Sequence, residues 1–485
     1  GLGSRQGACR GSCAASGCTV ELFMNGWHTG GVNVTLAPDM MEGFHDLGEA
    51  LSPALECTST GIPTGEPTYC KVFDSVARRV SDLCGVTEGK PLYLVPQERI
   101  FAWPTVEVGH RVEVSHVETP LGETVILETL SHSPRVFMVE NFMDHKEADQ
   151  IMEDALSMTD PNFQLKRSST GTTGKTVSKT RTSDNAFVTH TKTALALKRR
   201  IFKLLGIEGY HESWADGLQV LRYNVSKAYI AHLDYLEPAD GHDFASEGLG
   251  TNRYATVVLY FNNVEEGGET VFTHAPRPGG PDPSLPPLDE VLEELGLSPK
   301  SWEAKLLQDC RTKLAVRPTK GSGVLFYSQH PDGRVDNRSR HGACPVIKGQ
   351  KWAANLWVWN GPRYGLSEAH PETGRMVEAG HSKDSPDKPA GPMPVHASFV
   401  NRWSEDVDLY YEDTFFSAMP AGQASGANSF LTHVWNVKYQ GKVIKTWTIT
   451  EREKRQVFEL TAADAEAATG LSGDDAAAAG LSDAG

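Results

Sequence analysis

Short runs of apolar residues, several of them alternating with polar ones, dominate the chain from residue 186 onward and predict strands. Gly-, Pro- and Asp-rich turn signals separate the runs, which read LQVLRYNV, YATVVLYF, GETVFTH, LAVRP, GVLFYS and WAANLWVWN. Successive side chains of a strand point to opposite faces of its sheet, so an alternating run buries one face and exposes the other. Short strands at this spacing are typical of a sandwich or a barrel.

Helical and loop patterns lie mostly before and between these strands. Residues 135–158, PRVFMVENFMDHKEADQIMEDALS, predict a strand followed by a helix that begins after an acidic residue. The polar stretch KRSSTGTTGKTVSKT that follows is too rich in Gly, Ser and Thr to pack, and long loops of this kind are usually functional or mobile. Residues 276–302 predict an inserted loop with one short helix.

With 485 residues, the chain is long enough for two or three domains. We expect a flexible arm at 1–17, a small α+β domain at 18–105, a connector at 106–134, a strand-rich domain at 135–362, a linker at 363–394, a β-sandwich at 395–460 and a disordered low-complexity tail at 461–485. The β-β-α-β-β order within 18–105 resembles a ubiquitin-like or doublecortin-like fold.

Charge and cysteine content narrow the classes of partner and compartment. The net charge of −16 argues against nucleic acid as a partner, since nucleic-acid-binding proteins usually present a basic face. No apolar run approaches the length of a membrane span. Six of the eight cysteines fall within the first 84 residues without zinc-ribbon spacing. This crowding favours disulfides and the secretory pathway (endoplasmic reticulum or Golgi), with the cytosol or nucleus as the alternative.

The segment YIAHLDYLEP carries a candidate metal site. On a strand, His232 and Asp234 point to the same face, which suits either metal ligation or a surface ion pair at a strand end. His341 in SRHGACPVIKGQKW supplies a second imidazole, and the three residues fit a 2-His-1-carboxylate facial triad with open positions on Fe(II). Lys351 lies on a strand ten residues later. A buried lysine needs an anion, and the distal carboxylate of 2-oxoglutarate would serve.

Four segments together resemble the catalytic domain of the prolyl 4-hydroxylase family of Fe(II)/2-oxoglutarate oxygenases. They occur in the family's order within 135–362 and read LQVLRYNVSKAYIAHLDYLEP, RYATVVLYFNNVEEGGETVF, LAVRPTKGSGVLFYS and RHGACPVIKGQKWAANLWVW. The resemblance implies a mainly β domain, a double-stranded β-helix (jelly roll) flanked by helices.

The resemblance also implies roles for individual residues. His232, Asp234 and His341 would bind iron, Lys351 would hold the distal carboxylate of 2-oxoglutarate, and Tyr223 and Thr256 would contact the same cosubstrate. Peptide contacts, with ordinary scaffold packing as the alternative, would come from Arg181, Ser183, Arg253 and Trp357. A disulfide between Cys310 and Cys344 is expected because the family often carries cysteines at these places.

The implied activity is 4-hydroxylation of peptidyl proline with Fe(II), O₂, 2-oxoglutarate and ascorbate. Two other functions stay open: oxidation of another residue or of a small molecule, and a catalytically inactive scaffold that binds peptides. The sequence departs from the family pattern before His232, where an acidic-proline pair is missing, at Arg340, which replaces a leucine, and in the long insertion at 276–302. None of these departures removes a ligand, but all three bear on which peptide fits.

Residues 397–438 resemble the β domain of the von Hippel–Lindau family, a β-sandwich that recognises hydroxyproline. In SFLTHVW, the three residues Ser429, His433 and Trp435 have the spacing of that family's pocket residues. A hydroxyl pocket needs a hydrogen-bond donor, an acceptor and an apolar wall, which these residue types supply. We expect this unit to bind hydroxyproline peptides, with a packing module that binds nothing as the alternative.

Overall fold

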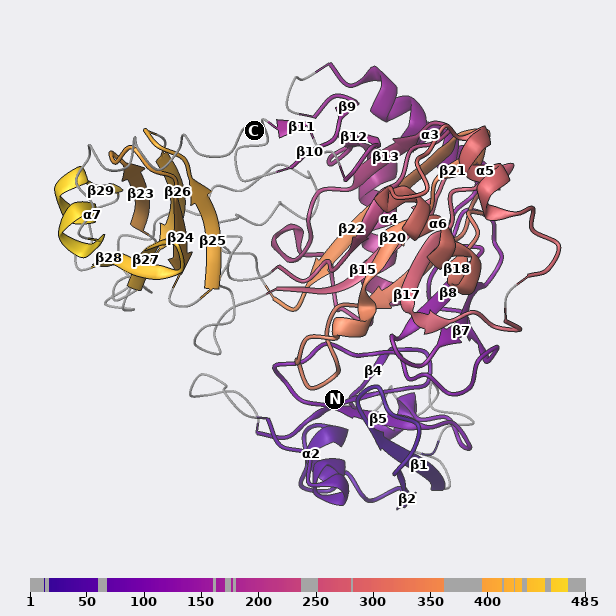
Figure 1. The fold of residues 1–485 in the computed structure, drawn as a ribbon. Coiled ribbons are helices and arrows are strands. Elements are labelled where there is room, and N and C mark those ends of the chain that lie inside the picture. The colour runs from indigo at the N-terminus through magenta and orange to yellow at the C-terminus, as the bar shows by residue number, and fades with distance from the viewer. Residues whose placement is uncertain are drawn as a thin grey trace. The chain divides into compact units, whose positions relative to one another are not determined.

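A computed structural model describes most of the chain. It covers residue 13 and residues 17–59, 68–159, 163–170, 176–177, 180–236, 252–280, 282–361, 395–411, 414–422, 424–429, 434–449 and 455–469. The described residues form two compact units, a larger one within 17–361 and a smaller one within 395–469 (Figure 1).

The larger unit is built on two antiparallel sheets whose strands alternate along the chain. The central strands of the first sheet are β13 (Gln219–Tyr223), β22 (Lys351–Trp359), β15 (Arg253–Tyr260) and β19 (Gly323–Tyr327). The second sheet is β14 (Tyr229–His232), β20 (His341–Ala343), β17 (Thr270–Pro276) and β18 (Lys313–Val316). Eight strands that cross between two sheets in this order form a jelly roll. The mainly β jelly roll predicted from the sequence is therefore confirmed.

Additional strands widen the first sheet on both sides. On the β19 side they are β8 (Val136–Glu140), β7 (Val125–Ser131) and β6 (Arg111–Val114), and on the β13 side β12 (Asp184–Phe187) and β9 (Lys166–Arg167). The short strands β10 (Ser169–Thr170) and β11 (Thr176–Val177) pair with each other, as do β16 (Glu266–Gly267) and β21 (Val346–Lys348). The strand and helix predicted within 135–158 are β8 and α3 (His145–Ser157), and Asp144 and Glu147 cap the helix reciprocally.

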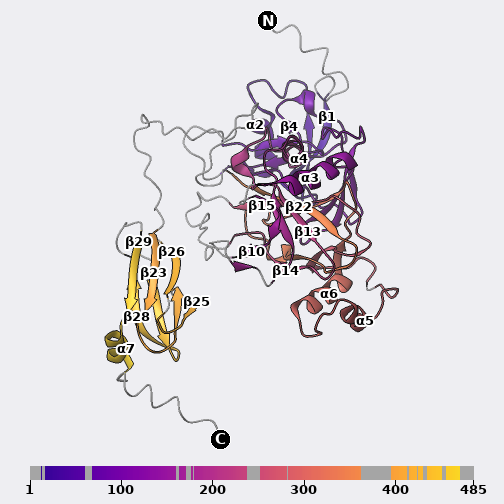
Figure 2. The same ribbon diagram turned by 90° about the horizontal axis from the view of Figure 1, so that it is seen from above.

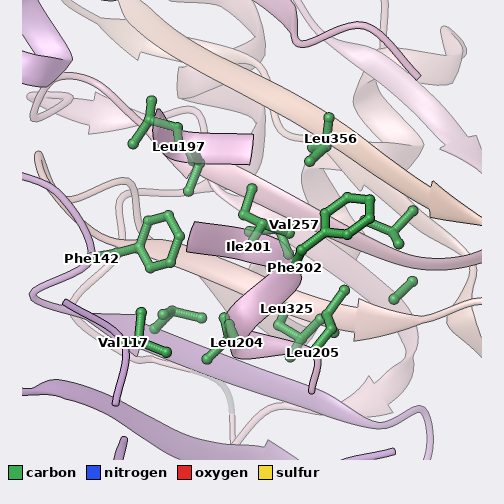
Figure 3. Packing of buried hydrophobic residues seen from close by; sticks show 14 of the residues in the cluster. Val117, Phe142, Leu197, Ile201, Phe202, Leu204, Leu205, Val257, Leu325 and Leu356 are labelled. Carbon is green, nitrogen blue, oxygen red and sulfur yellow. The ribbon is translucent and has the colours of Figure 1, made fainter. Parts of the chain in front are cut away.

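Helix α4 (Lys192–Leu204) covers the face of the first sheet that points away from the second sheet. Figure 3 shows Ile201 and Phe202 of this helix among Val257, Leu325 and Leu356 of the sheet, and all five side chains are fully buried. The other face of the same strands packs inside the jelly roll against β17. The central strands are thus apolar on both faces, which explains the nearly continuous apolar runs in their sequences.

A five-stranded mixed sheet precedes the jelly roll. Its order is β2 (Val32–Leu36), β1 (Cys18–Met24), β5 (Leu92–Val95), β3 (Lys71–Phe73) and β4 (Arg79–Val80), with β1 and β5 parallel and α2 (Leu47–Leu51) between β2 and β3 along the chain. The ubiquitin-like assignment and the domain boundaries stay predictions.

The two faces of this N-terminal sheet belong to different cores. Leu22 and Leu94 point into a core that the N-terminal residues build themselves. Their neighbours Phe23 and Tyr93 point the other way, into the core cluster that contains α4 and the jelly-roll sheet. Strand alternation therefore makes the N-terminal sheet one layer of the larger unit (Figure 1).

Trp103 joins the two parts. Its indole Nε1 donates to the Leu204 carbonyl at 2.8 Å, and its backbone N–H donates to the Tyr327 hydroxyl at 3.0 Å. The ring is 1% exposed and packs edge-on against Phe101. Both N–H groups of Trp103 find acceptors and its carbonyl accepts from Arg135, so burying this large side chain carries little penalty.

The insertion between β17 and β18 holds two helices, α5 (Leu288–Glu294) and α6 (Trp302–Thr312). The short helix predicted within 276–302 is α5, whereas α6 begins at the end of that range and was not predicted, although the cap Ser301 and the buried pair Leu306 and Leu307 are a helical signal. Cys310 of α6 forms the expected disulfide with Cys344. The described residues also contain the disulfides Cys13–Cys18 and Cys57–Cys70. No helix in the described part of the chain is long and apolar enough to span a bilayer.

The smaller unit has two sheets that share one aromatic core. The sheets are β26-β23-β29 and β25-β24-β27-β28, followed by α7 (Ala462–Thr469). The expectation of a disordered tail from residue 461 is wrong for this helix, because Ala465 is buried in the core of the unit. Their strands are β23 (Val395–Asn401), β24 (Val407–Tyr411), β25 (Thr414–Met419), β26 (Ala424–Ser429), β27 (Val434–Tyr439), β28 (Lys442–Thr448) and β29 (Arg455–Leu460). Phe399, Trp435 and Trp447 lie at the centre of the core.

Replacing Trp103 by alanine should destabilise the larger unit by about 3–5 kcal/mol, the usual cost of truncating a buried aromatic side chain. Urea denaturation followed by circular dichroism measures this free energy. The control is Trp27→Ala, because Trp27 is 54% exposed and its loss should cost less than about 1 kcal/mol. Equal costs for the two variants would mean that the N-terminal sheet and the jelly roll do not depend on one shared core.

Candidate active site

The three predicted metal ligands come together at one end of the second jelly-roll sheet. His232 is the last residue of β14, His341 is the first of β20, and the two face each other across the antiparallel pair. Asp234 lies two residues beyond His232. Its Oδ1 is 3.4 Å from His232 Nε2 and its Oδ2 is 3.5 Å from His341 Nε2. The ligand atoms of all three residues lie within 4.8 Å of one another, which is the spacing a single metal ion requires.

Backbone carbonyls orient both imidazoles. His232 Nδ1 is 2.9 Å from the Ile230 carbonyl oxygen, and His341 Nδ1 is 3.0 Å from the Ser339 carbonyl oxygen. A carbonyl can only accept, so each Nδ1 carries the proton and each Nε2 offers a lone pair toward Asp234. Such second hydrogen bonds fix the ring orientation and the tautomer that metal binding needs.

The protonation states also suit a metal. Burial alone raises the pKa of the Asp234 carboxyl, but His341, His232 and Arg253 outweigh it and hold this pKa well below its usual range. Burial lowers the pKa of His341 to about 4, although the Asp234 carboxylate opposes this shift. At neutral pH the site therefore offers a carboxylate and a neutral His341 imidazole, the forms that bind a divalent cation.

Thr256 supports the carboxylate. Its Oγ1 donates a 2.7 Å hydrogen bond to Asp234 Oδ2, and its side chain is fully buried on β15. The contact between Thr256 and the cosubstrate that the family resemblance implies stays a prediction.

A cavity extends from the two histidines to Lys351. Tyr223, Thr270 and Lys351 line it, together with His232 and His341. Lys351 begins β22, is 2% exposed, and has no hydrogen-bond acceptor or ion-pair partner among the residues of the described structure. Its Nζ lies 5.5 Å from the centre of the Tyr223 ring and 5.6 Å from that of Tyr260. A buried ammonium group that faces a cavity without an acceptor fits an anionic ligand.

Thr270 and Tyr229 are among the lining residues that the sequence did not predict. Thr270 Oγ1 accepts a 2.8 Å hydrogen bond from the Tyr260 hydroxyl and lies beside the lysine end of the cavity. Tyr229 stacks on His232 with ring centroids 3.9 Å apart. The segment EEGGETVF and the tyrosine three residues before His232 were visible signals, but only strand pairing shows that they face this cavity.

The predicted peptide contacts fall into two stacked pairs and one buried serine. The Arg181 guanidinium lies 4.8 Å over the Tyr229 ring, and that of Arg253 lies 4.0 Å over the Trp357 ring. Ser183 is fully buried, with its Oγ 3.1 Å from Ser168 Oγ. Arg253 also approaches the metal site, because it donates to the Asp234 carbonyl at 3.4 Å. The roles of these four residues in peptide binding stay predictions.

The hydroxyproline pocket predicted in the smaller unit is not assembled by the described residues. His433 and the side chain of Ser429 lie outside them. Trp435 is 3% exposed and packs on Phe399 with ring centroids 4.7 Å apart, in the core of the unit. Its role as a pocket wall stays a prediction.

Sequence comparisons agree with the site. Residues 218–359 match the 2OG-Fe(II) oxygenase superfamily. The chain is similar to probable prolyl 4-hydroxylase 4 of Arabidopsis thaliana, with 33% identity over 243 residues, 48% of this chain and 70% of the relative. It is also similar to prolyl 4-hydroxylase 2 of the same plant, with 33% identity over 241 residues, 48% of this chain and 69% of the relative.

One solved structure with which the chain aligns is the viral collagen prolyl hydroxylase of Paramecium Bursaria Chlorella virus-1 in complex with 2OG. The identity is 18% and the TM-score 0.29, and the alignment covers 46% of this chain and 95% of that chain.

Replacing Thr256 by valine, which keeps the shape and removes the hydroxyl, should weaken Mn(II) binding about tenfold, the low end of the effect of removing a hydrogen bond onto a ligand. Titration calorimetry measures the dissociation constant. Thr129→Val is the matched control, because Thr129 is also buried but lies on β7. Unchanged Mn(II) affinity in Thr256→Val would remove Thr256 from the support of the metal site.

Proposed function

The chain belongs to the prolyl 4-hydroxylase family of 2OG-Fe(II) oxygenases, and we propose that it hydroxylates proline residues in peptide or protein substrates. The observation that carries this proposal is the pairing of the His232–Asp234–His341 cluster with the unpartnered Lys351 ammonium across one cavity. A metal triad alone suits many reactions. A triad that shares its cavity with a buried cation suits an oxygenase whose cosubstrate is a dicarboxylate.

In the proposed reaction, the residues of the cavity would bind the metal and the cosubstrate. His232, Asp234 and His341 would hold Fe(II), and Lys351 would pair with the distal carboxylate of 2-oxoglutarate, with the Tyr223 and Thr270 hydroxyls in the same part of the cavity. When bound, the metal and cosubstrate use O₂ to convert a C–H bond into C–OH while 2-oxoglutarate becomes succinate and CO₂. Ascorbate, which is typical of the family, keeps the iron reduced.

The substrate would lie over the open side of the metal site. The planar groups of the stacked pairs Arg181–Tyr229 and Arg253–Trp357 would line the path of the peptide. The Trp357 indole Nε1 is buried and has no acceptor among the described residues, so it is a suitable donor to a peptide carbonyl. These groups hold the peptide and keep water from the reacting atoms.

Two other functions remain alternatives. A lysine residue or a small molecule could replace proline, because the arginine–aromatic pairs do not by themselves select the ring. An inactive peptide-binding scaffold is disfavoured, since such a protein has no use for the complete ligand set and a buried lysine that costs stability without its anion.

Mass spectrometry of a peptide library incubated with Fe(II), ascorbate, 2-oxoglutarate and O₂ tests the proposal. We expect one added oxygen atom on proline, with stoichiometric succinate, and no product from Asp234→Ala, which lacks a metal ligand. Oxygen on lysine, or turnover of small molecules alone, would replace the proposed substrate. No turnover with any substrate, or normal turnover by Asp234→Ala, would overturn the assignment.

Lys351→Ala should raise the KM for 2-oxoglutarate by a factor of about 30 or more, because truncating one partner of a buried charge pair costs about 2–5 kcal/mol. Burial lowers the pKa of Lys351 to about 8, with Glu269 opposing the shift. The ammonium exists below this pKa, so kcat/KM for 2-oxoglutarate should fall as the pH rises through about 8. Lys320→Ala, a surface change, is the kinetic control. An unchanged KM in Lys351→Ala would require another anchor.

A further inference from the structure

Helix α6 of the insertion packs on the outer face of the second jelly-roll sheet, behind the metal ligands. Its buried residues Leu306 and Cys310 form one apolar cluster with Ala228, Val271 and Cys344. These partners lie in or beside β14, β17 and β20, so the helix spans the strands that carry both histidines. Figure 2 shows α6 beside β14, with α5 next to it.

The contact between α6 and the second sheet includes a residue next to the metal ligand His341. Gly342 follows His341, and strand alternation points it to the opposite face of the sheet. A Cβ built on Gly342 would lie 3.1 Å from Leu306 Cδ1, 2.9 Å from the Tyr229 carbonyl oxygen and 3.2 Å from the Ala231 backbone nitrogen. Leu306 therefore rests directly on the backbone of β20, where that strand meets β14.

A covalent bond fixes the same face. Cys310 lies four residues after Leu306, one helical turn along the same side of α6. Cys344 lies two residues after Gly342, on the same side of the β20 segment. The Cys310–Cys344 disulfide and the Leu306–Gly342 contact thus attach the helix to the strand at two successive points.

Strand β14 has few other supports. It is the edge strand of its sheet, and its pairing with β20 is irregular between Tyr229 and His232. On its outer side, among the described residues, β14 pairs with the short segment 180–182: Arg181 forms an isolated bridge with Tyr229, Thr182 N–H donates to the Ala228 carbonyl, and Ile230 N–H donates to that of Thr180. A short, irregular edge strand can shift easily, and a shift would move His232 relative to His341.

We propose that α6 supports the metal site by packing against the outer face of the strands that carry its ligands. Leu306 and the two cysteines of the Cys310–Cys344 disulfide are then positioning residues for His232 and His341. The proposal deepens the proposed function, on which it rests for the identity of the ligand as a divalent metal. None of these residues touches the metal. They hold the two strands at the spacing that lets both imidazoles reach one ion.

Neighbouring leucines of α6 provide a matched test. Leu306 and Leu307 are both 3% exposed, but Leu307 points away from the sheet and packs with Val291 and Leu292 of α5. Leu306→Ala and Leu307→Ala should lower the melting temperature by similar amounts. Only Leu306→Ala should weaken Mn(II) binding, by about tenfold in titration calorimetry, and change the visible spectrum of bound Co(II), which reports ligand geometry.

The disulfide gives a second test that does not depend on folding of Leu306→Ala. The double variant Cys310→Ser/Cys344→Ser should weaken Mn(II) binding, whereas Cys57→Ser/Cys70→Ser, which removes a disulfide near the N-terminal sheet, should leave it unchanged. Where Cys310→Ser/Cys344→Ser does not fold, the folded wild-type protein is reduced with a dithiol, the excess dithiol, which itself binds metal ions, is removed before titration, and unreduced Cys57→Ser/Cys70→Ser is the control. By thiol–disulfide exchange, the dithiol is oxidised to its own disulfide and the protein disulfide is reduced to two thiols.

The outcomes separate this inference from the function it rests on. Equal Mn(II) affinities in the two leucine variants, or equal affinities in the two cysteine variants, would overturn the role of α6 and leave the oxygenase assignment intact. Failure of the wild-type protein to bind Mn(II) or Co(II) at all would instead contradict the proposed function.

Discussion

The cross-strand placement of His232 opposite His341, with the carboxylate of Asp234 between them, is the constraint around which the jelly roll is organised. A buried carboxylate is expensive unless charges and hydrogen bonds surround it. Here two imidazoles and the Thr256 hydroxyl contact Asp234, and Arg253 lies close by. These groups come from β14, β15 and β20, so both sheets must be correctly paired before the carboxylate is supported and the Nε2 atoms of both imidazoles lie beside it. The same pairing of strands is therefore required both for the jelly-roll fold and for the proposed chemistry.

Lys351, at the other end of the cavity, is also a buried charge, but a positive one. Lys351 is buried among Tyr223 and Tyr260 without an acceptor in the described part of the chain, and burial lowers its pKa. Such a group costs stability in the free protein and regains it when an anion binds. The binding energy of a dicarboxylate is thereby concentrated on one end of the ligand, which fixes the direction in which its other end approaches the metal cluster.

The sequence predicted those parts of the site that rest on local patterns. The alternation of His232 and Asp234, the late His341 and the strand-borne Lys351 were all visible, and the structure brings them together. The sequence could not distinguish Thr256 from Thr270, because both are polar residues on apolar strands. Only the pairing of the strands shows that Thr256 faces the metal ligand Asp234 and that Thr270 faces the cavity. The packing of α6 behind the ligands was also missed, since it depends on contacts between residues far apart in sequence. For the same reason the strand pattern predicted a sandwich or a barrel, and the family resemblance a jelly roll, but neither predicted the sharing of its core with the N-terminal sheet.

The core shared by the N-terminal sheet and the jelly roll constrains how such a chain can evolve. Phe23 and Tyr93 contribute to the same core as Leu325 and Leu356, and Trp103 is bonded to both α4 and β19. A recombination event that exchanged the first hundred residues for those of another protein would leave an apolar face of the jelly roll open to water. The N-terminal sheet and the oxygenase fold should therefore be inherited together, with compensating substitutions on the two sides of their contact. The smaller unit has an aromatic core of its own and is not bound by this constraint.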